Sequence, residues 1–385
     1  MKIKVLYILN RAIMGGATIS FLNMIEGLAA YGVEPIVVIP RNDHHGEELL
    51  RYLQEHHITF YQTTLTATSL HKPTSILHFL RICLSGLLMY LRKVSSYFEL
   101  QKIVRKEKPD IIHTNVGIIR EGLTVARKAG IPHILHIREY QNKDFGWMFV
   151  PSRKSYERFV RRSDAIITIT DDLRSYFHLQ GMPKAKTIYN GIYPKDSTIL
   201  KHEKQPYFLC ACRIVPGKGY EDVIEAFSRF YEHHPEYELR IAGQGDSAYL
   251  NRLKKMIDKK TCKDNIRFLG HVSNVRPLMA EATALLVASR SEGFGRMTAE
   301  ACFNGCLVIG RNTAGTKEIL SVTGGFLFDD LQTMVNNMEK VCHLSADEYL
   351  LIAEAAQEKA KELYSIESNT EQIYQVYNQL ISKRT

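Results

Sequence analysis

Residues 284–301 read ALLVASRSEGFGRMTAEA, and this stretch decides the fold that the sequence predicts. It opens on an uncharged apolar run, 284–288, which is typical of a strand buried in a parallel sheet. Gly293 and Gly295 then permit a tight turn and a close approach of the backbone, and a helix is expected just beyond them. The stretch therefore predicts one strand–turn–helix unit of an α/β domain.

The rest of the second half repeats this unit. Short apolar runs alternate there with helical patterns, as in a doubly wound parallel sheet. Its expected strands are residues 207–212, 238–242, 266–269, 284–288 and 307–310, and its expected helices include 220–233 and 247–260.

The first half shows the same alternation. Together the two halves predict an α/β chain of two Rossmann-like, doubly wound parallel-sheet domains that face each other across a cleft. A turn and a polar stretch after Asn190-Gly191 mark the boundary, so residues 1–190 and 191–365 are the expected domains, with the terminal helical pattern, 366–385, rejoining the first. The expected strands of the first half are residues 5–9, 36–39, 111–113, 133–136 and 165–169.

Two carboxylates accompany the glycine turn. Ligands of open α/β sheets bind outside the carboxyl ends of the strands, where Glu292 is expected, and Glu300 follows eight residues later on the helix. The helix start after Gly295 offers unpaired N–H groups and a positive dipole end, which suit a diphosphate. One carboxylate could bind sugar hydroxyls and the other ribose hydroxyls. The structural alternative is a helix cap and a solvated glutamate.

Two cations follow the strand at 207–212, in the segment Arg213-Ile-Val-Pro-Gly-Lys218-Gly219. A guanidinium and an ammonium within one loop can neutralise a diphosphate, although a solvated basic loop is the alternative. Gly243-Gln244-Gly245 also follows a strand, but an isolated GxG is a weak signal that usually marks only a turn.

The composition is that of a globular protein. Of the 385 residues 45% are hydrophobic and 24% charged, and no uncharged apolar stretch is long enough to span a bilayer. The short apolar N-terminus lacks the features of a signal peptide, so a cytoplasmic location is expected. The seven cysteines are expected to be buried free thiols of a reducing compartment. The pairs Cys210/Cys212 and Cys302/Cys306 lack the spacing of a zinc site, so no metal is predicted.

The net charge of +9 is unevenly distributed. Residues 1–190 contain 26 Lys and Arg against 16 Asp and Glu, a balance of +10, whereas the remainder has 24 against 25, a balance of −1. Leucines at helical spacing in residues 76–91, with basic flanks that reach residue 108, predict an amphipathic helix on an anionic membrane surface. An ordinary packing helix is the alternative. Nucleic acid is not an expected partner, because the basic region lacks aromatic interleaving and a recognised motif.

Taken in order, these segments resemble the retaining glycosyltransferases of family 4, which have the GT-B fold. The glutamate pair matches the family's E-x7-E motif, and the resemblance covers nearly the whole chain. It is carried by Gly15-Gly16-Ala17, Arg213 with Lys218-Gly219, Gly243-Gln244-Gly245, residues 268–272 (FLGHV), Glu292 to Glu300, and Gly315-Thr-Lys-Glu318.

The resemblance implies catalytic roles for four residues. Glu292 would lie beside the hydroxyls of the donor sugar, and Arg213 and Lys218 would hold the diphosphate and stabilise the leaving group. His136 would contact the donor sugar from the acceptor side, unless it is a structural histidine. The further donor-binding positions that the resemblance implies are Gly15, Gly16, Arg138, Gly243, Gly245, His271, Val272, Gly293, Phe294, Gly295, Arg296, Met297 and Glu300.

Within that set, Glu300 would accept hydrogen bonds from the ribose, and the loop at His271-Val272 would lie against the base. Gly16 would bring backbone against the phosphates when the cleft closes. The sequence departs from the family pattern at Ala211-Cys212 and Ala314, where glycine is common, and at Tyr193, where an acid is frequent. These departures leave the identity of the donor open.

The function that the resemblance implies is retaining hexosyl transfer from a nucleotide-diphosphate sugar. UDP is the expected nucleotide, the acceptor is a glycan or a polyprenyl-linked sugar, and the pathway is synthesis of cell-surface polysaccharide. No pair of aspartates suggests magnesium, so neither a metal nor a cofactor is expected. Two alternatives remain: a nucleotide-sugar epimerase of the same architecture, and a non-catalytic protein that binds nucleotide-sugars.

Overall fold

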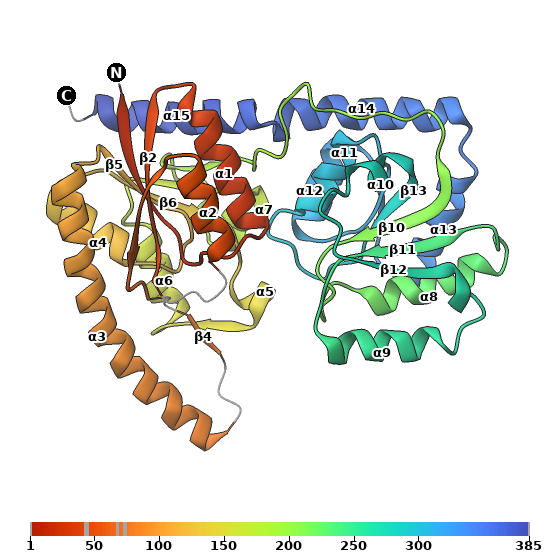
Figure 1. Ribbon diagram of the computed structural model, residues 1–385, viewed down its shortest axis with the longest axis horizontal. Coiled ribbons are helices and arrows are strands. Elements are labelled where there is room, and N and C mark those ends of the chain that lie inside the picture. The colour runs from red at the N-terminus through yellow and green to blue at the C-terminus, as the bar shows by residue number, and fades with distance from the viewer. Residues whose placement is uncertain (1, 42–45, 67–68, 72–74, 384–385) are drawn as a thin grey trace. The chain divides into compact units, whose positions relative to one another are not determined.

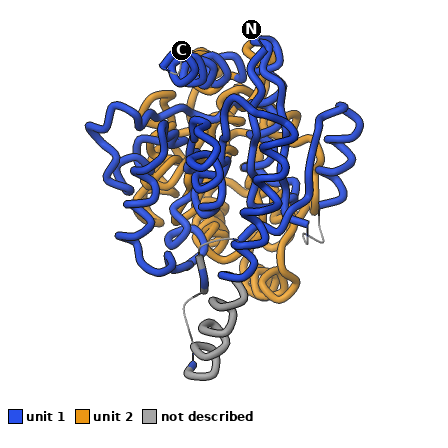
Figure 2. Tube along the Cα trace, turned by 90° about the vertical axis from the view of Figure 1, so that its left-hand side faces the viewer, with its two compact units in different colours: residues 1–191, 366–385 blue, residues 192–365 orange. Residues whose placement is uncertain are grey.

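A computed structural model describes residues 2–41, 46–66, 69–71 and 75–383, with the side chains of 69, 71 and 76–89 left out. The chain forms two compact units, coloured separately in Figure 2. Met1–Gly191 and Ile366–Thr385 make the first unit, and Ile192–Ser365 makes the second. The expected boundary lay at residue 190.

The first unit is built on a sheet of seven parallel strands in the order β3-β2-β1-β5-β6-β8-β9. Its central strands are short apolar runs, and β1 pairs with β2 from Ile3↔Val33 to Ile8↔Val38. The strands of this sheet are β1 (Ile3–Ile8), β2 (Val33–Pro40), β3 (Thr59–Thr63), β5 (Ile111–Thr114), β6 (His133–Ile137), β8 (Ala165–Thr168) and β9 (Ala185–Thr187).

Helices cover both faces of this sheet, because successive strand residues point to opposite sides. Val5 and Tyr7 pack with α1, α2 and α15, whereas Leu6 and Ile8 pack with α3 and α4. In Figure 1, α15 lies beside α1, with which it packs. The bounds are α1 (Gly16–Ala29), α2 (Glu47–Glu55), α3 (Ile76–Glu107), α4 (Glu121–Ala129) and α15 (Ile366–Ser382); the smaller elements are α5 (Asn142–Phe145), α6 (Arg153–Val160), α7 (Asp171–Tyr176) and the antiparallel pair β4 (Ser69–His71) and β7 (Trp147–Phe149).

The second unit contains six parallel strands in the order β12-β11-β10-β13-β14-β15, of which the first four are labelled in Figure 1. Phe208 and Cys210 of β10 pack on one face with α8, α9 and α13, and Tyr207 and Leu209 pack on the other with α10, α11 and α12. The strands are β10 (Gln205–Ala211), β11 (Glu238–Ala242), β12 (Ile266–Gly270), β13 (Ala282–Val287), β14 (Val308–Arg311) and β15 (Phe326–Phe328). The helices are α8 (Tyr220–Tyr231), α9 (Ser247–Ile257), α10 (Arg276–Glu281), α11 (Arg296–Phe303), α12 (Ala314–Thr323), α13 (Leu331–Cys342) and α14 (Ala346–Tyr364), with one 3₁₀ turn at Lys263–Asn265.

The fold class predicted from the sequence is confirmed: both units are Rossmann-like parallel sheets with helices on both faces. Four cysteines are buried free thiols, as expected, whereas Cys212 and Cys342 are only half-buried. Cys83 lies outside the described side chains. The buried free thiols are Cys210, Cys262, Cys302 and Cys306.

Candidate active site

The strand order of the second sheet locates its binding edge. The chain builds outward from β10 through β11 to β12, then returns to the other side of β10 with β13 (Figure 1). Ligands of open α/β sheets bind at such a reversal, outside the carboxyl ends of the two central strands. Arg213 and Lys218 lie in the loop after β10, and Glu292 lies in the loop after β13. The structure therefore brings the two predicted cations and the predicted carboxylate to one edge.

Lys218 and Glu292 form an ion pair at this edge. The ammonium Nζ donates to Oε1 of Glu292, and each side chain is 21% exposed. Burial lowers the pKa of Lys218, but the charges of Glu292 and Cys212 and the Glu292 hydrogen bond together raise it by more, so the net pKa lies above its ordinary value. A small pocket beside the pair is lined by Cys212, Ser289 and Met297. Lys218 is thus held as a cation in a partly desolvated position.

Arg213 lies in the same loop but is exposed to solvent. Its positive charge acts on Lys218, whose pKa it lowers slightly against the larger effects described above. The loop is joined to the β13 loop through the backbone, because Arg290 N–H donates to Gly217 O at 2.9 Å. Two cations consequently share one short loop that is fastened beside Glu292.

Gly243 and Gly245 allow the neighbouring loop to pack against this one. A Cβ on Gly243 would lie 2.0 Å from the carbonyl oxygen of Cys212, and one on Gly245 would lie 1.9 Å from that of Ile214. Ile214 N–H also donates to Gln244 O at 2.7 Å. The glycines therefore have a packing role, and their contact with a donor remains a prediction.

Helix α11 starts at the predicted glycine turn. Gly295 caps it with a φ of +88°, a left-handed conformation that favours glycine. Arg296 is its first helical residue, and the first N–H groups of a helix have no acceptor within it. Gly315 N–H donates to Glu292 O at 3.1 Å, which holds the turn in place. The helix start thus presents donors and a positive dipole end beside the Lys218–Glu292 pair.

Glu300 is almost fully buried on α11 and has protein partners. Arg296 Nε lies 2.6 Å from its Oε1, and Tyr193 hydrogen-bonds to the same carboxylate. Burial raises the pKa of Glu300, while the Arg296 charge lowers it. Arg276 stacks over the Tyr193 ring, with its guanidinium carbon 4.3 Å from the ring centroid. The departure from the family pattern at Tyr193 thus bears directly on Glu300, whose contact with ribose stays a prediction.

The other predicted positions of this unit differ in exposure. His271 is exposed and Val272 half-buried, in the loop after β12. Phe294 is buried, with its ring edge-on to that of Tyr364 at 5.6 Å. Gly293 lies in the same turn, half-buried. The contact of each of these residues with a donor stays a prediction.

The first unit holds a buried histidine chain at the carboxyl edge of its sheet. His113 Nε2 lies 3.2 Å from His136 Nδ1, and His113 Nδ1 lies 2.7 Å from the Tyr377 hydroxyl of α15. Burial, with the nearby Arg138 charge, lowers the pKa of both histidines well below the ordinary value, so both are neutral. Among the described residues, His136 Nε2 is buried and has no hydrogen-bond partner.

Arg138 is buried beside this chain. Its Nε donates to Asn115 Oδ1 at 3.0 Å and its Nη1 to Asn190 Oδ1 at 2.6 Å. Burial lowers the pKa of Arg138 to about 9. The guanidinium joins the residues that follow β5 and β6 to Asn190, which is a structural role. Its contact with a donor stays a prediction. Gly15 caps α1 and Gly16 is its first residue.

Sequence reasoning missed two partners of these networks, Tyr377 and Asn190. The sequence predicts a helix at the C-terminus, but no local signal shows that Tyr377 reaches His113, 264 residues away along the chain. In the sequence, Asn190 indicates only the turn at the domain boundary.

Two family models match the chain. The model described as "Glycosyltransferase Family 4" matches residues 14–196, and the model described as "Glycosyl transferases group 1" matches residues 194–361, so together they extend over 14–361. The chain belongs to glycosyltransferase family 4. The predicted resemblance is therefore confirmed.

Curated relatives of this glycosyltransferase are distant. An uncharacterised glycosyltransferase of Methanocaldococcus jannaschii is 26% identical over 302 residues, which is 74% of this chain and 80% of the relative. N-acetyl-alpha-D-glucosaminyl L-malate synthase of Bacillus anthracis is 25% identical, and alpha-monoglucosyldiacylglycerol synthase of Acholeplasma laidlawii is 27% identical. Each of these two matches covers 44% of this chain and spans only about half of the relative, 47% and 50%.

Solved structures show the same architecture. The Anabaena protein HepE in complex with UDP aligns over 98% of this chain and 100% of its own, with a TM-score of 0.78 and 18% identity. S. aureus TarM in a complex that contains UDP aligns over 98% and 100%, with a TM-score of 0.76 and 14% identity. This likeness shows the fold, and the glycosyltransferase has the GT-B fold.

Proposed function

We propose that this glycosyltransferase is a retaining hexosyltransferase that uses a UDP-sugar donor. The observation that carries the proposal is the Lys218–Glu292 pair at the strand reversal of the second unit, with the start of α11 beside it. The carboxylate would accept hydrogen bonds from the donor sugar and orient the ammonium toward the diphosphate. UDP in the HepE and TarM crystal structures supports the choice of nucleotide.

The difficult step in the proposed reaction is cleavage of the bond between the anomeric carbon and the diphosphate oxygen. Negative charge then develops on the leaving group, while the sugar gains oxocarbenium character. Lys218, Arg213 and the start of α11 supply positive charge and N–H donors where that charge develops. We propose that these groups replace a metal, and that no cofactor takes part. Addition of Mg²⁺ or Mn²⁺ to metal-depleted protein should then leave the transfer rate unchanged.

The proposed stereochemistry is retention by attack on the same face of the sugar from which the leaving group departs. A phosphate oxygen of the leaving group would accept the proton of the acceptor hydroxyl, so no carboxylate need act as a covalent nucleophile. The E-x7-E motif that ends at Glu300 supports this choice. NMR of the product should show the anomeric configuration of the donor, and the opposite anomer would contradict retention.

In the first unit we propose that His136 contacts the donor sugar. Its buried, neutral ring carries a nitrogen, Nε2, that has no partner among the described residues. A buried polar atom of this kind is costly unless a ligand or water satisfies it. A sugar hydroxyl would meet that requirement.

The proposed acceptor is a glycan or a lipid-linked sugar in the synthesis of cell-surface polysaccharide. The names of two relatives contain the name of a lipid; they are alpha-monoglucosyldiacylglycerol synthase and the gpi3 subunit of phosphatidylinositol N-acetylglucosaminyltransferase. Within the described chain, no helix combines the length and apolarity needed to cross a bilayer. We therefore propose a cytoplasmic protein that binds peripherally to the inner face of the membrane.

Helix α3 is the proposed membrane contact. Tyr90, Leu91, Val94 and Phe98 are exposed by 65, 58, 44 and 57%, and Leu91, Val94 and Phe98 follow the i, i+3, i+7 spacing of one helical face. The leucines at 77–88, on which the sequence prediction also relied, lie outside the described side chains. Exposed basic residues flank the stripe in the sequence and favour an anionic surface; they are Arg92, Lys102, Arg105 and Lys106, whereas Lys93 is half-buried.

The variant Lys218→Ala tests the proposed site. Loss of the ammonium should reduce the transfer rate by about 10²–10³, the usual effect of removing one preorganised charge-stabilising donor. Lys260→Ala is the matched control, because Lys260 pairs with Glu225 at 2.6 Å in the same unit and is 23% exposed. Donors are first screened by thermal shift, and transfer is then measured by release of UDP in the presence of acceptor.

Three outcomes would contradict the proposal. Near-normal transfer by Lys218→Ala would remove its central residue. Conversion of the donor to an epimer without acceptor would indicate an epimerase. Donor binding without turnover over a panel of lipid-linked and glycan acceptors would indicate a non-catalytic binding protein.

A further inference from the structure

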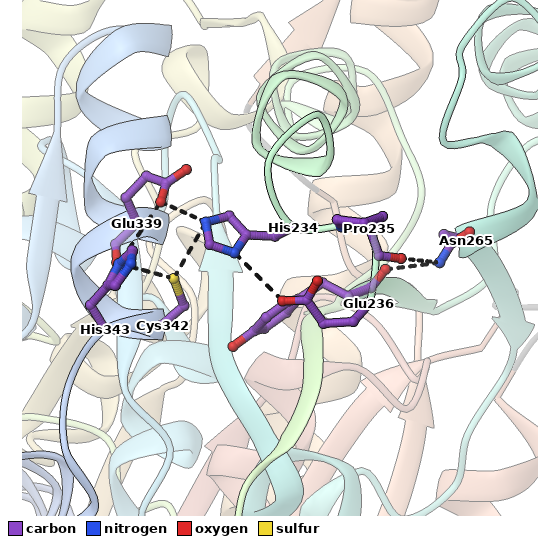
Figure 3. A network of polar contacts seen from close by, with 8 residues as sticks. His234, Pro235, Glu236, Asn265, Glu339, Cys342 and His343 are labelled. Carbon is purple, nitrogen blue, oxygen red and sulfur yellow. Dashed lines mark hydrogen bonds and ion pairs between the residues drawn. The ribbon is translucent and has the colours of Figure 1, made fainter.

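Four potential metal ligands converge at the ends of two helices of the second unit. His234 follows α8, Glu339 and Cys342 lie in the last turn of α13, and His343 caps that helix (Figure 3). One ligand atom from each of the four residues lies within 4.8 Å of all the others. The cluster joins two helices that already pack against each other.

The distances within the cluster approach those of a tetrahedral metal site. His234 Nε2 lies 2.7 Å from Glu339 Oε2 and 3.9 Å from Cys342 Sγ, and His343 Nδ1 lies 3.4 Å from Cys342 Sγ and 3.9 Å from Glu339 Oε2. Zinc bonds to nitrogen, oxygen and sulfur of roughly 2.0–2.3 Å place neighbouring tetrahedral ligands about 3.3–3.8 Å apart. Small side-chain movements would therefore bring all four atoms to one ion.

Glu236 and Phe230 contact the His234 ring. Its other ring nitrogen, Nδ1, lies 3.5 Å from Glu236 Oε1, which corresponds to the carboxylate–histidine–metal arrangement of many zinc proteins. The ring is also stacked on Phe230, at 4.4 Å between centroids and 15° between planes. Both contacts hold the imidazole so that Nε2 points toward Glu339 and Cys342 (Figure 3).

The identities of the ligands select the metal. Two imidazoles, one thiolate and one carboxylate form a mixed set that suits zinc, whereas calcium and magnesium prefer oxygen ligands alone. We propose that His234, Glu339, Cys342 and His343 bind one Zn²⁺ ion. Four protein ligands fill a tetrahedral shell, so the site is structural and leaves no position for a substrate.

The location of the cluster supports a structural role. A helix between two parallel strands runs back toward their amino ends, so α8, between β10 and β11, ends at the amino edge of the sheet. The contact of Glu339 with His234 places the end of α13 at the same edge. β11 begins at Glu238, four residues after His234. The Lys218–Glu292 pair lies at the opposite, carboxyl edge, in loops that follow β10 and β13. Zinc would fasten α8 to α13 without taking part in transfer.

The sequence predicts no metal, because neither cysteine pair has the spacing of a zinc motif. The proposed site contains one cysteine, and His234 lies 108 residues before it. Only the packing of α8 on α13 brings these ligands together. His343 Nδ1 now lies 2.7 Å from the Glu339 carbonyl oxygen, and metal binding would replace that hydrogen bond.

The test uses the full untagged chain, reduced, treated with EDTA and freed of chelator. Titration with Zn²⁺ should reach one equivalent per chain by elemental analysis. Co²⁺ should give the intense visible bands of a tetrahedral site and a near-ultraviolet charge-transfer band from the Cys342 thiolate. A stoichiometry well below one, or octahedral Co²⁺ without the charge-transfer band, would overturn the proposal.

Variants separate this site from adventitious binding. Cys342→Ser should abolish the charge-transfer band, and His234→Gln should weaken Zn²⁺ affinity at least tenfold. The matched control is His233→Gln, since His233 is exposed, adjacent in sequence and outside the cluster. Equal affinity in His234→Gln and His233→Gln would overturn the proposal. Circular dichroism of each variant establishes that it is folded, so that lost binding reports on the ligands.

Discussion

At the scale of one residue, Tyr193 replaces the acid that is frequent in the family and changes the surroundings of Glu300 in the E-x7-E motif. An acid at this position would place a second carboxylate near the buried Glu300, whereas the tyrosine donates a hydrogen bond to it. Arg296 pairs with the same carboxylate, and Arg276 stacks on the tyrosine ring. The local charge is therefore more positive than the family pattern implies, which favours an anionic ligand.

Glu139 gives a prediction of pH dependence. Burial, followed by the Asp144 charge, raises its pKa to about 7. Between about pH 4.5 and 7, the Glu139 carboxyl is therefore protonated in the folded state and ionised in the unfolded state. The stability that this carboxyl contributes is fully present below about pH 4.5 and is lost as the pH rises through about 7. The slope is at most about 1.4 kcal/mol per pH unit.

The measurement is urea unfolding of wild type and Glu139→Gln at several pH values from 4.5 to 8. The difference in unfolding free energy between the two proteins should change with pH over that interval, because the amide cannot titrate. A constant difference would show that Glu139 titrates normally. This comparison also cancels the contributions of other acids, such as Glu300.

At the scale of elements, the interior strands could be predicted and several edge strands could not. β13, ATALLV over Ala282–Val287, overlaps its expected range of 284–288, because a strand with neighbours on both sides needs an apolar sequence. β3, TFYQT, and β9, AKT, lie at the two edges of the first sheet and are polar or short. β15 has only three residues. Edge strands pair on one side alone, so their sequences carry less of the apolar signal.

The loops of the candidate site also contain features that could be predicted from the sequence and features that could not. The glycine turn before α11 and the cations after β10 could be located, because each directly follows an apolar strand. The contact of Tyr193 with Glu300 and that of Tyr377 with His113 could not, since they depend on the packing of segments far apart in the chain. Charged side chains near strand ends were thus predictable, and their partners were not.

Helix α3 gives the prediction that belongs to this scale. Wild-type protein should float with anionic phospholipid vesicles at low salt, and the double variant Leu91→Ser/Phe98→Ser should bind less, because two exposed apolar side chains are lost. Raising the salt should weaken binding by screening the basic residues. The control is Leu351→Ser, which removes a leucine that is 70% exposed from α14 of the other unit.

Two results would contradict the membrane proposal. Wild type that fails to float would show that α3 does not bind such a surface. Equal flotation of the α3 double variant and Leu351→Ser would show that binding does not depend on the exposed stripe.

At the scale of the whole molecule, the second unit is one continuous segment with a core on each face of its sheet. Its two ends are fastened to each other, because Ile192 N–H donates to Tyr364 O at 2.8 Å and Tyr193 bridges to Ser365. We therefore predict that residues 192–365 fold alone and bind UDP within about tenfold of the full chain, but transfer no sugar. Calorimetric titration with UDP measures the affinity.

The same fragment with Lys218→Ala is the control, and it should bind UDP more weakly. A folded fragment that binds no UDP, although the full chain does, would show that donor affinity needs the first unit. An active fragment would contradict the proposed role of His136.

The first unit, by contrast, is completed by the end of the chain. Ile373, Val376 and Tyr377 of α15 belong to its core, and the Tyr377 hydroxyl lies 3.1 Å from that of Tyr7. On the ribosome, all 174 residues from 192 to 365 are therefore synthesised before the last helix emerges. Residues 192–365 can therefore fold before the first unit is complete. Until α15 is synthesised, the nascent first unit has an open hydrophobic groove beside α1.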